Sequence, residues 1–458
     1  MRKNSKMHFI LCLLLLSFAA CKKNNPIQEN LNVTPEAPAV VAPDPIQTGP
    51  SYSKIYEVGS GSGDLVINGT SYTLGGTVLF KVKGGTYRSI KIANVDGGTG
   101  LVTIQNNGLV ESTGEMRLEN LNNVVLTGNG TSGINKGFSF QNIGYRAIQV
   151  DGKINNFTLQ YFNFKNIGDN VITYKYEAAY TGAESSISQN LKFSNIDCDN
   201  TGQFISGSGT SDNGTIKGFI KNLEISYVNF QNSSGVGSIV WFGNVENYDI
   251  HHNVVNNINT ANDNHNGIFL MNGNGKFHHN KITNHQGNAI RAFSFSVGST
   301  PKEVLIYNNI VVNSRKYSAF EIQIFDTAIS AGKTTYVNAK VFNNTCGNLN
   351  LSKDWQGNVV DIYTLRGGTC EVYNNLAFNL FTNGANKASF GGQESDTKSL
   401  ESNNMYYSSS KEAGIVDETS FKLNSSAPVK GKGKHENILT DDYFGSARAQ
   451  LPSVGAVE

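Results

Sequence analysis

Three charged residues recur at one position of a repeated motif in the second half of the chain. Arg291, Glu321 and Asp361 each follow a pair of apolar residues. Because side chains alternate between the two faces of a strand, a charged residue after an inward apolar residue points outward. Strands on neighbouring rungs of a sheet lie about 4.8 Å apart. We therefore predict a vertical row of one arginine and two carboxylates on the outside of a sheet.

The same alternation predicts what flanks this row. Phe269 is expected to continue it on the preceding rung, with Val240 and Ile205 further upstream. A second outward column is predicted to comprise Met271, Phe293, Gln323 and Tyr363. Exposed aromatic rings can stack on sugar rings, and an apolar patch with a polar rim often marks a binding site. The alternative is a surface salt-bridge ladder, which contributes little to stability.

His265 and Lys316 lie in the bends just before two of the charged strands. Either side chain could act there as a general base or as a clamp for a carboxylate. If the chemistry is proton abstraction, Arg291 would neutralise a substrate carboxylate and His265 or Lys316 would take the proton. If it is acid and nucleophile catalysis, Glu321 and Asp361 would be the pair, and like charges on adjacent rungs raise the pKa of one.

Six of the eight histidines lie between positions 251 and 285. The pairs His251-His252 and His278-His279 occupy equivalent positions of the repeat, so we expect their rings to stack. No carboxylate or cysteine completes a metal site there, and no metal is predicted. A calcium ion held by Glu321 and Asp361 is an open alternative to having no cofactor at all.

The element that must position these residues is itself a repeat. An apolar residue, two variable positions and an asparagine recur, and the motif ends at Asn253, Asn280, Asn309, Asn344 and Asn375. A period of roughly 30 residues without helical periodicity predicts an all-β fold, a right-handed parallel β-helix solenoid. We expect the asparagines to take the left-handed conformation at bends and their amides to bond from rung to rung.

Composition limits the classes of partner. The chain has 458 residues and a formal net charge of +1, which gives no general reason to expect nucleic-acid binding. Of its five cysteines, Cys12 and Cys21 lie near the N-terminus, and Cys198, Cys346 and Cys370 are an odd number at unrelated positions, so no disulfide framework is predicted. We expect a monomer.

The N-terminal region has the features of an export signal and tether. Residues 1–20 combine basic residues with a short apolar run, and Ser17-Phe18-Ala19-Ala20 precede Cys21. This pattern predicts a lipoprotein signal peptide with lipidation at Cys21. Residues 21–50 hold six of the nine prolines and form a tether. The protein would then be lipid-anchored at a bacterial outer membrane.

The remainder divides into three parts. Residues 51–135 are predicted to be an N-terminal cap and the first coils, 136–395 the main coils, and 396–458 the last coils with a closing segment. Two insertions interrupt the repeat, at Glu177–Ser188 and Thr327–Thr335. Insertions in solenoids become loops on one face, often the binding face.

The chain resembles a known group in three features. These are the lipoprotein box, the asparagine-marked coils and an ending that reads Asp442-x-x-Gly445-x-x-Arg448, then Pro452-x-x-Gly455-Ala456-x-Glu458. They resemble right-handed parallel β-helix lipoproteins of Bacteroidetes type, in the pectate-lyase-like superfamily. That superfamily includes lyases, hydrolases, epimerases and non-catalytic members. None of its sharper active-site signatures is present. Lys22-Lys23-Asn24-Asn25 lacks the acidic run that often directs such lipoproteins outward, so the cell surface and the periplasmic face both stay open.

The resemblance implies carbohydrate as the substrate class. We expect an envelope-anchored protein that processes a polysaccharide, with a lyase acting on a uronate-containing glycan ahead of a glycoside hydrolase using Glu321 and Asp361. A non-catalytic glycan-binding or surface-scaffold protein is the alternative from another class.

Overall fold

A computed structural model describes residues 51–382, 385–386, 389–392 and 396–458. The expected signal peptide, Cys21 and the tether lie outside the described residues. Within the described part, no helix has the length and apolar character needed to span a membrane. The described residues all belong to one compact unit, Pro50–Glu458.

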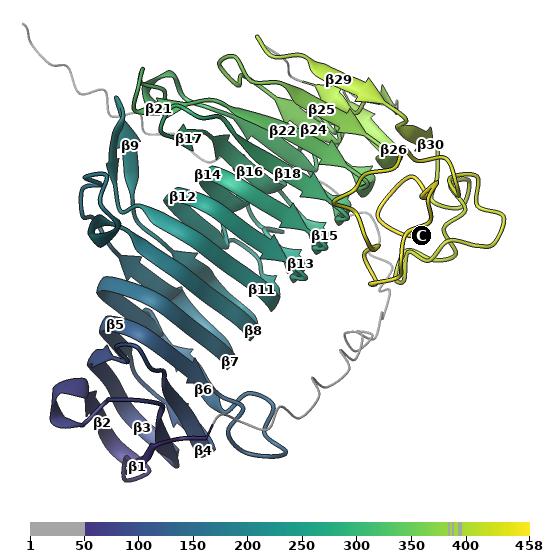
Figure 1. The fold of residues 1–458 in the computed structure, drawn as a ribbon. Helices are drawn as coiled ribbons and strands as arrows, with labels where there is room; N and C mark the ends of the chain where they lie inside the picture. The colour runs from purple at the N-terminus through teal and green to yellow at the C-terminus, as the bar shows by residue number, and fades with distance from the viewer. Residues whose placement is uncertain (1–50, 383–384, 387–388, 393–395) are drawn as a thin grey trace, which may run out of the picture. The chain divides into compact units, whose positions relative to one another are not determined.

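The described chain winds into a parallel β-helix whose coils stack along one axis (Figure 1). A typical coil contributes three strands, β16 (Asn288–Ser294), β18 (Lys302–Tyr307) and β19 (Ile310–Ser314). Each pairs in parallel with the equivalent strand of the next coil, namely β20 (Phe320–Gln323), β22 (Val337–Phe342) and β23 (Thr345–Leu349). The parallel β-helix predicted from the repeat is therefore confirmed.

Three sheets run along the axis. Sheet 1 comprises the starts of β12 (Val240–His251) and β14 (Gly267–His278), followed by β16, β20, β24 (Val360–Ile362) and β28 (Gly391–Gly392). Sheet 2 comprises the ends of β12 and β14, followed by β18, β22, β25 (Cys370–Tyr373) and β29 (Ser399–Ser402). Sheet 3 comprises β13 (Val254–Ile258), β15 (Lys281–His285), β19, β23, β26 (Leu376–Thr382) and β30 (Met405–Tyr407).

Several strands of the earlier coils, such as β3 (Val78–Asp96) and β7 (Ile148–Lys175), are long and turn corners without a break. The other strands of this part are β1 (Lys54–Val58), β2 (Ser62–Asn68), β4 (Val102–Ser112), β5 (Met116–Thr127), β6 (Phe138–Ile143), β8 (Ser188–Ser206) and β11 (Ile220–Ser233). Short pieces outside the coils are β9 (Thr210–Asp212), β10 (Thr215–Lys217), β17 (Ser296–Val297), β21 (Thr334–Thr335), β27 (Ala385–Asn386) and the 3-10 turns Gly69–Ser71, Glu184–Ser186 and Asp326–Ala328.

A continuous apolar core fills the coils. The apolar residue that opens each repeated motif lies on sheet 2, points inward and is fully buried, as at Ile250, Phe277, Ile306, Val341 and Val372. Each stacks on its equivalent one rung away. Burial of such residues is the main stabilising contribution of a solenoid, in which each coil contacts only its neighbours.

The repeated asparagines form a buried amide ladder between sheets 2 and 3. The side-chain nitrogen of Asn309 donates to Asn344 Oδ1 at 2.9 Å and to the Phe277 carbonyl at 2.9 Å, while its oxygen accepts from Asn280 at 3.1 Å. The ladder runs from Asn253 to Asn404. The predicted rung-to-rung bonds are confirmed.

The predicted backbone conformation of these asparagines is wrong by one residue. The left-handed residues are those that precede them, His252, His279, Asn308, Asn343, Asn374 and Asn403, with φ between 49° and 54°. The corner residue turns the chain with its side chain outside, whereas the ladder asparagine must direct its amide inward from ordinary backbone.

The closing segment folds back over sheet 3 instead of adding coils. Its apolar residues Val454, Ala456 and Val457 pack against Ile310 and Leu376. The carboxylate of Asp442 accepts backbone hydrogen bonds from Phe444, Ser446 and Glu458, and Arg448 donates to Asn308 Oδ1 at 2.7 Å. The ending motif is thus a clip that holds this segment to the left-handed corners.

Candidate functional site on sheet 1

The predicted charged row exists on the outer side of sheet 1. Arg291 pairs with Glu321, and Glu321 pairs with Asp361, on successive rungs of β16, β20 and β24. Their inward neighbours Ile290, Phe320 and Val360 are in the core. The upstream continuation of the row is Leu270 and then Trp241. The row therefore changes from apolar to charged at Arg291.

The prediction for Phe269 was wrong. Phe269 pairs with Ile290 and lies buried in the core, as does Met271, and Val240 and Ile205 continue that inward column. The run Ile268-Phe269-Leu270-Met271 is apolar throughout, so it carries no alternation that would reveal its face, and a slip of one residue exchanges the two faces. Phe269 cannot contact a substrate in this structure.

Glu321 is fully buried beneath other polar groups. Arg291 Nε donates to Glu321 Oε1 at 2.5 Å, and Gln323 Nε2 donates to the same oxygen. His265 Nε2 lies 2.7 Å from the other oxygen, Oε2, although the hydrogen bond of that nitrogen is directed to Asn288 Oδ1 at 3.1 Å. The carboxylate therefore faces the Arg291 guanidinium on one oxygen and the His265 ring on the other.

Asp361 is equally buried but has no cationic contact. It accepts a hydrogen bond from Asn358 Nδ2 at 2.7 Å, and its Oδ2 has no hydrogen-bond partner among the described residues. Burial raises the pKa of Asp361 to about 7, and the Glu321 carboxylate adds to the rise, while the hydrogen bond from Asn358 opposes it. Asp361 therefore exchanges its proton near neutral pH.

His265 is held at the surface above Glu321. Its ring stacks on Tyr317 with centroids 4.2 Å apart, and Arg291 Nη1 donates to its backbone carbonyl at 3.1 Å. Its Nδ1 makes no hydrogen bond within the described part of the chain. An imidazole with one nitrogen fixed near a buried carboxylate and the other available is a suitable general base.

Lys316 is less suited to that role. Its ammonium lies 3.0 Å from Asp354 Oδ2, and this contact raises the pKa of Lys316 above its ordinary value. A lysine that stays protonated at neutral pH cannot accept a proton. Its ammonium also lies 5.7 Å from the centre of the Trp355 ring, so it belongs to the rim of the site.

Aromatic rings flank the charged row on both sides, but not those expected. Phe293 is 7% exposed and is covered by Phe325, whose ring lies 4.6 Å away and is 55% exposed. On the other side Trp355 is 41% exposed. Phe325 and Trp355 lie in bends where no repeat pattern marks them. A tryptophan in a chain that has only two was the one available signal.

The remaining predicted members occupy the second column. Phe293 pairs with Gln323, and Tyr363 follows the end of β24. Gln323 donates to Glu321, and the Glu321 and Asp361 carboxylates add to the burial that raises the pKa of Tyr363 to about 12. Gln323 therefore supports the buried Glu321 carboxylate.

The stacked histidines are confirmed, away from the row on sheet 2. His251 stacks on His278 at 5.1 Å and His252 on His279 at 4.9 Å. Burial lowers the pKa of His252 to about 4 and that of His279 to about 2. These neutral rings pack the corner, and His279 bonds to the Asp442 carbonyl at 3.1 Å.

A metal ion does not fit the row. Across the described residues, no group of three or more His, Cys, Asp or Glu side chains is placed to hold one. At Glu321 the oxygens that calcium would need already face Arg291, Gln323 and His265. The positive guanidinium at 2.5 Å would repel a cation there.

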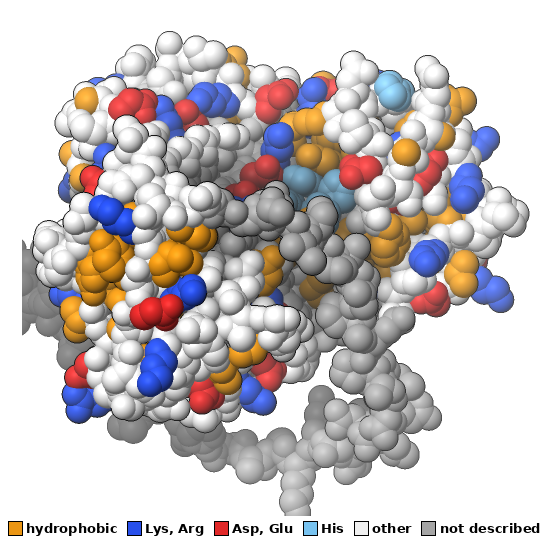
Figure 2. Space-filling model, turned by 60° about the horizontal axis from the view of Figure 1, so that its bottom comes forward, with side chains coloured by type: hydrophobic (Ala, Val, Ile, Leu, Met, Phe, Trp, Pro, Cys, Tyr) orange, Lys and Arg blue, Asp and Glu red, His pale blue; other side chains and the backbone are white. Residues whose placement is uncertain are grey.

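Charge elsewhere is dispersed. Figure 2 shows basic and acidic side chains interspersed over one face, without a large patch of one sign. This distribution agrees with the near-zero net charge.

Comparison with known proteins gives distant likenesses. No protein-family model matches the chain, and no curated protein matches it. A PL6 family polysaccharide lyase from Pseudopedobacter saltans has a TM-score of 0.39 at 12% identity, over 85% of this chain and 98% of that one. Pectate lyase Pel9A has a TM-score of 0.35 at 14% identity, over 90% and 97%. At this distance neither activity is carried over to the residues of sheet 1.

Proposed function

We propose that this protein cleaves a uronate-containing polysaccharide by elimination at the charged row of sheet 1. The observation that carries the proposal is that one buried carboxylate, Glu321, holds both a histidine and an arginine at the surface. Their side chains are 23% and 22% exposed, whereas Glu321 is fully covered. His265 and Arg291 are therefore the two partners of this carboxylate that a substrate can reach.

The proposed reaction assigns one role to each of these two residues. The Arg291 guanidinium pairs with the uronate carboxylate, which makes the neighbouring C–H bond more acidic. His265 Nδ1 takes that proton, the C–H electrons form a carbon–carbon double bond, and the glycosidic C–O bond breaks. The leaving oxygen receives a proton from solvent. The products are an unsaturated uronate and a new sugar end.

The buried residues would act through these two. Glu321 fixes the ring orientation of His265 and the position of Arg291, because a carboxylate beside one ring nitrogen orients the imidazole. Asp361, on the next rung, shares the same covered space and exchanges its proton near neutrality. Both are positioning residues in this scheme.

The hydrolytic alternative has less support. An acid and a nucleophile must both contact the glycosidic bond, yet Glu321 and Asp361 are each 0% exposed. A non-catalytic glycan-binding role is favoured by a different observation, the exposed rings of Trp355 and Phe325 beside the row. Aromatic faces of this kind contribute to binding whether or not chemistry follows.

The test is an activity screen of the soluble body over a panel of acidic and neutral polysaccharides. Elimination is read by the ultraviolet absorbance of the unsaturated product and hydrolysis by reducing ends alone. We expect unsaturated product from wild type and a loss of at least about a hundredfold in His265→Ala and Arg291→Ala.

Matched controls are His435→Ala in the closing segment and Arg117→Ala on β5, several coils before the charged row. Reducing ends without unsaturated product would replace elimination by hydrolysis. Binding without any product would leave the glycan-binding role.

We further propose that Cys21 carries the lipid that anchors the protein to the bacterial outer membrane. The support is the sequence alone, small residues before Cys21 and a proline-rich stretch after it. Cys21→Ser should abolish incorporation of labelled palmitate and release the protein from membranes. Label retained in that variant would contradict the proposal.

A further inference from the structure

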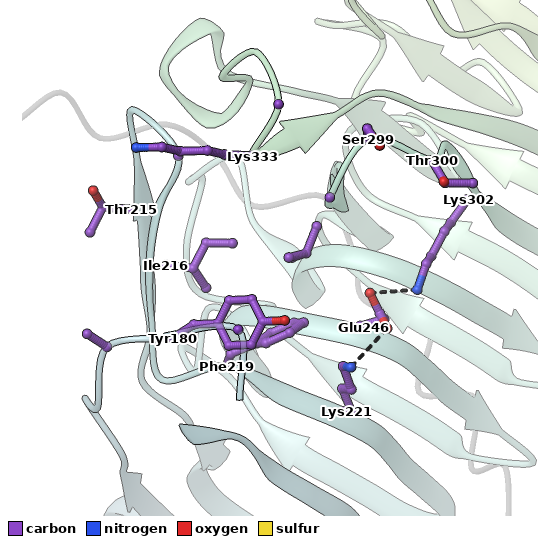
Figure 3. A pocket seen from close by; sticks show the side chains of 16 residues that line it. Tyr180, Thr215, Ile216, Phe219, Lys221, Glu246, Ser299, Thr300, Lys302 and Lys333 are labelled. Atoms are coloured by element: carbon purple, nitrogen blue, oxygen red, sulfur yellow. Dashed lines mark ion pairs between the residues drawn. The ribbon is translucent and has the colours of Figure 1, made fainter. Parts of the chain in front are cut away.

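A cavity separate from the charged row lies beside sheet 1, at the corner where the chain passes to sheet 2. It has a volume of about 680 Å³, within the range of small-molecule sites. Its lining comes from both predicted insertions, from the β9–β10 hairpin and from the loop after β16, and Figure 3 shows side chains from these segments around one space. None of its residues belongs to the charged row.

Three lysines and one glutamate provide the charge of this cavity. Lys302 lies 2.6 Å from Glu246 and Lys221 lies 3.8 Å from it, as the dashed lines in Figure 3 mark. Lys221 also lies 3.7 Å from Glu184, which is outside the lining. The Lys333 ammonium makes no ion pair or hydrogen bond with any residue that the structure describes. Each ammonium has three donors. The lining therefore keeps a net positive charge and spare donors.

The floor of the cavity is aromatic. Tyr180 packs edge-to-face on the buried Phe219, with ring centroids 4.9 Å apart. Ile187 and Ile216 support the pair from below, in a small apolar cluster separate from the coil core. The Tyr180 hydroxyl forms no hydrogen bond within the described residues. An aromatic face beside a cation suits a ligand that has both an apolar ring face and an anionic group.

The walls are built structures braced against one another. β17, in the loop after β16, pairs antiparallel with β21 in the second insertion. The backbone N–H of Asn213, at the tip of the hairpin, donates to the Thr327 carbonyl at 2.7 Å. Segments from coils far apart in sequence are thereby joined around the same space. Such long-range bracing is not needed to stabilise coils that already stack.

The cavity and the charged row are both lined by the segment that begins with β16. β16 carries Arg291 and Phe293, and the same segment reaches the cavity lining at Val297. A polymer lying along the outside of sheet 1 could then contact Arg291 and the cavity with different sugar units.

We propose that this cavity binds carboxylated sugar units of the polysaccharide, at a place separate from the bond that is cleaved. Lys302 and Lys333, which lie on opposite sides of the space in Figure 3, would each contact the carboxylate of a different sugar unit, and Tyr180 would stack on a sugar ring. The proposal rests on the proposed function for the identity of the polymer, but its binding can be measured without turnover.

The test uses calorimetric titration with hexasaccharides of galacturonate, mannuronate and guluronate, and with cellohexaose as the neutral probe. Titrations are made on the His265→Ala background, where no cleavage is expected to consume the probe. We expect at least one of the three uronate hexamers to bind and cellohexaose to bind at least about tenfold more weakly. Lys302→Met with Lys333→Met should weaken uronate binding by about tenfold or more.

The matched control is Lys340→Met on sheet 2, where the lysine side chain is 32% exposed compared with 38% for Lys302. Equal binding by the double variant and the control would overturn the proposal, as would no uronate binding or equal binding of cellohexaose. Binding that depends on the two lysines, without unsaturated product from the wild type, would keep the cavity proposal and reject elimination.

Discussion

Two polar stacks run along the same solenoid and differ in almost every respect. The amide ladder from Asn253 to Asn404 is uncharged, buried and bonded from rung to rung over six asparagines. The row from Arg291 to Asp361 spans three rungs, carries three ionisable groups and leaves Asp361 Oδ2 without a hydrogen bond within the described residues. A satisfied buried network specifies a structure, whereas an unsatisfied charged one is a candidate for chemistry.

The difference lies in what each stack does with its hydrogen-bonding capacity. Every ladder amide between Asn280 and Asn375 uses both its nitrogen and its oxygen within the coil. In the row, the Glu321 carboxylate instead faces the surface residues His265 and Arg291, and one oxygen of Asp361 has no hydrogen bond within the described residues. We expect changes in the ladder to affect stability alone, and changes in the row to affect stability and function together.

The largest effect is expected from Asn309→Ala. The substitution removes the side-chain partner of the Phe277 carbonyl and of the Asn280 backbone N–H, whereas the Asn344 oxygen keeps only the bond from the backbone N–H of residue 309. We expect the free energy of unfolding to fall by about 3–5 kcal/mol, measured by urea denaturation.

The control for the ladder is Asn313→Gly. Asn313 belongs to an outer stack of asparagines, Asn284, Asn313, Asn348 and Asn379, whose amides also bond from rung to rung. Its backbone is left-handed and its amide is exposed. Glycine suits that backbone, so a cost below about 1 kcal/mol is expected. Equal costs at the two positions would show that the inner ladder is not the special feature.

A pH-dependent effect of intermediate size is expected from Asp361→Asn. An unfolded aspartate releases its proton near pH 4, whereas folded Asp361 holds it to about pH 7. The folded state therefore binds the extra proton between these values, and this group makes stability fall as pH rises through that window. The free energy of unfolding of the variant, minus that of wild type, should therefore rise by about 2–3 kcal/mol as pH increases from about 5 to about 8.

Subtracting the wild-type stability from that of Asp361→Asn cancels the pH dependence that other ionisable groups contribute to both. Histidines such as His252, with a pKa lowered to about 4, make stability rise with pH below about 6.5 and are present in both proteins. A difference that does not change with pH would mean that Asp361 is ionised in the folded state throughout.

Glu321→Gln is expected to cost about 2 kcal/mol of stability and most of the activity. The amide keeps the shape but leaves the Arg291 guanidinium without its ion pair, and the partial exposure of Arg291 lessens the penalty. Glu303→Gln is the control, since its pair with Lys340 is exposed and should cost under about 0.5 kcal/mol. Full turnover in Glu321→Gln would place the chemistry away from the row.

The smallest effect is expected from Trp355→Ala. Loss of an exposed ring beside the row should weaken glycan binding by about 1 kcal/mol, roughly fivefold, without changing the unfolding midpoint. Binding is measured by affinity electrophoresis, and Tyr145→Ala, an exposed ring on an early coil, is the control. If the glycan slows Trp355→Ala and Tyr145→Ala equally in the gel, Trp355 is not part of the binding surface.

The amide ladder and the charged row could be predicted from the sequence, whereas the residues that cover and flank the row could not. The motif ending in asparagine repeats at a fixed position in each coil, so the inner ladder and the pairing of Arg291, Glu321 and Asp361 could be derived from spacing. Phe269 could not be placed, because an all-apolar run has no period. The burial of the two carboxylates depends on bends such as that of Trp355, whose contacts are distant in sequence and follow no repeat.

The spacing of the ladder has a consequence for how this chain can change over generations. Successive ladder asparagines are separated by 27, 29, 35, 31 and 29 residues, yet each amide bonds in the same way. Insertions and deletions in the bends therefore leave the ladder in frame, whereas one within a ladder strand breaks it. Lineages can exchange bends, and with them ligand preference, while whole coils are gained or lost only as units.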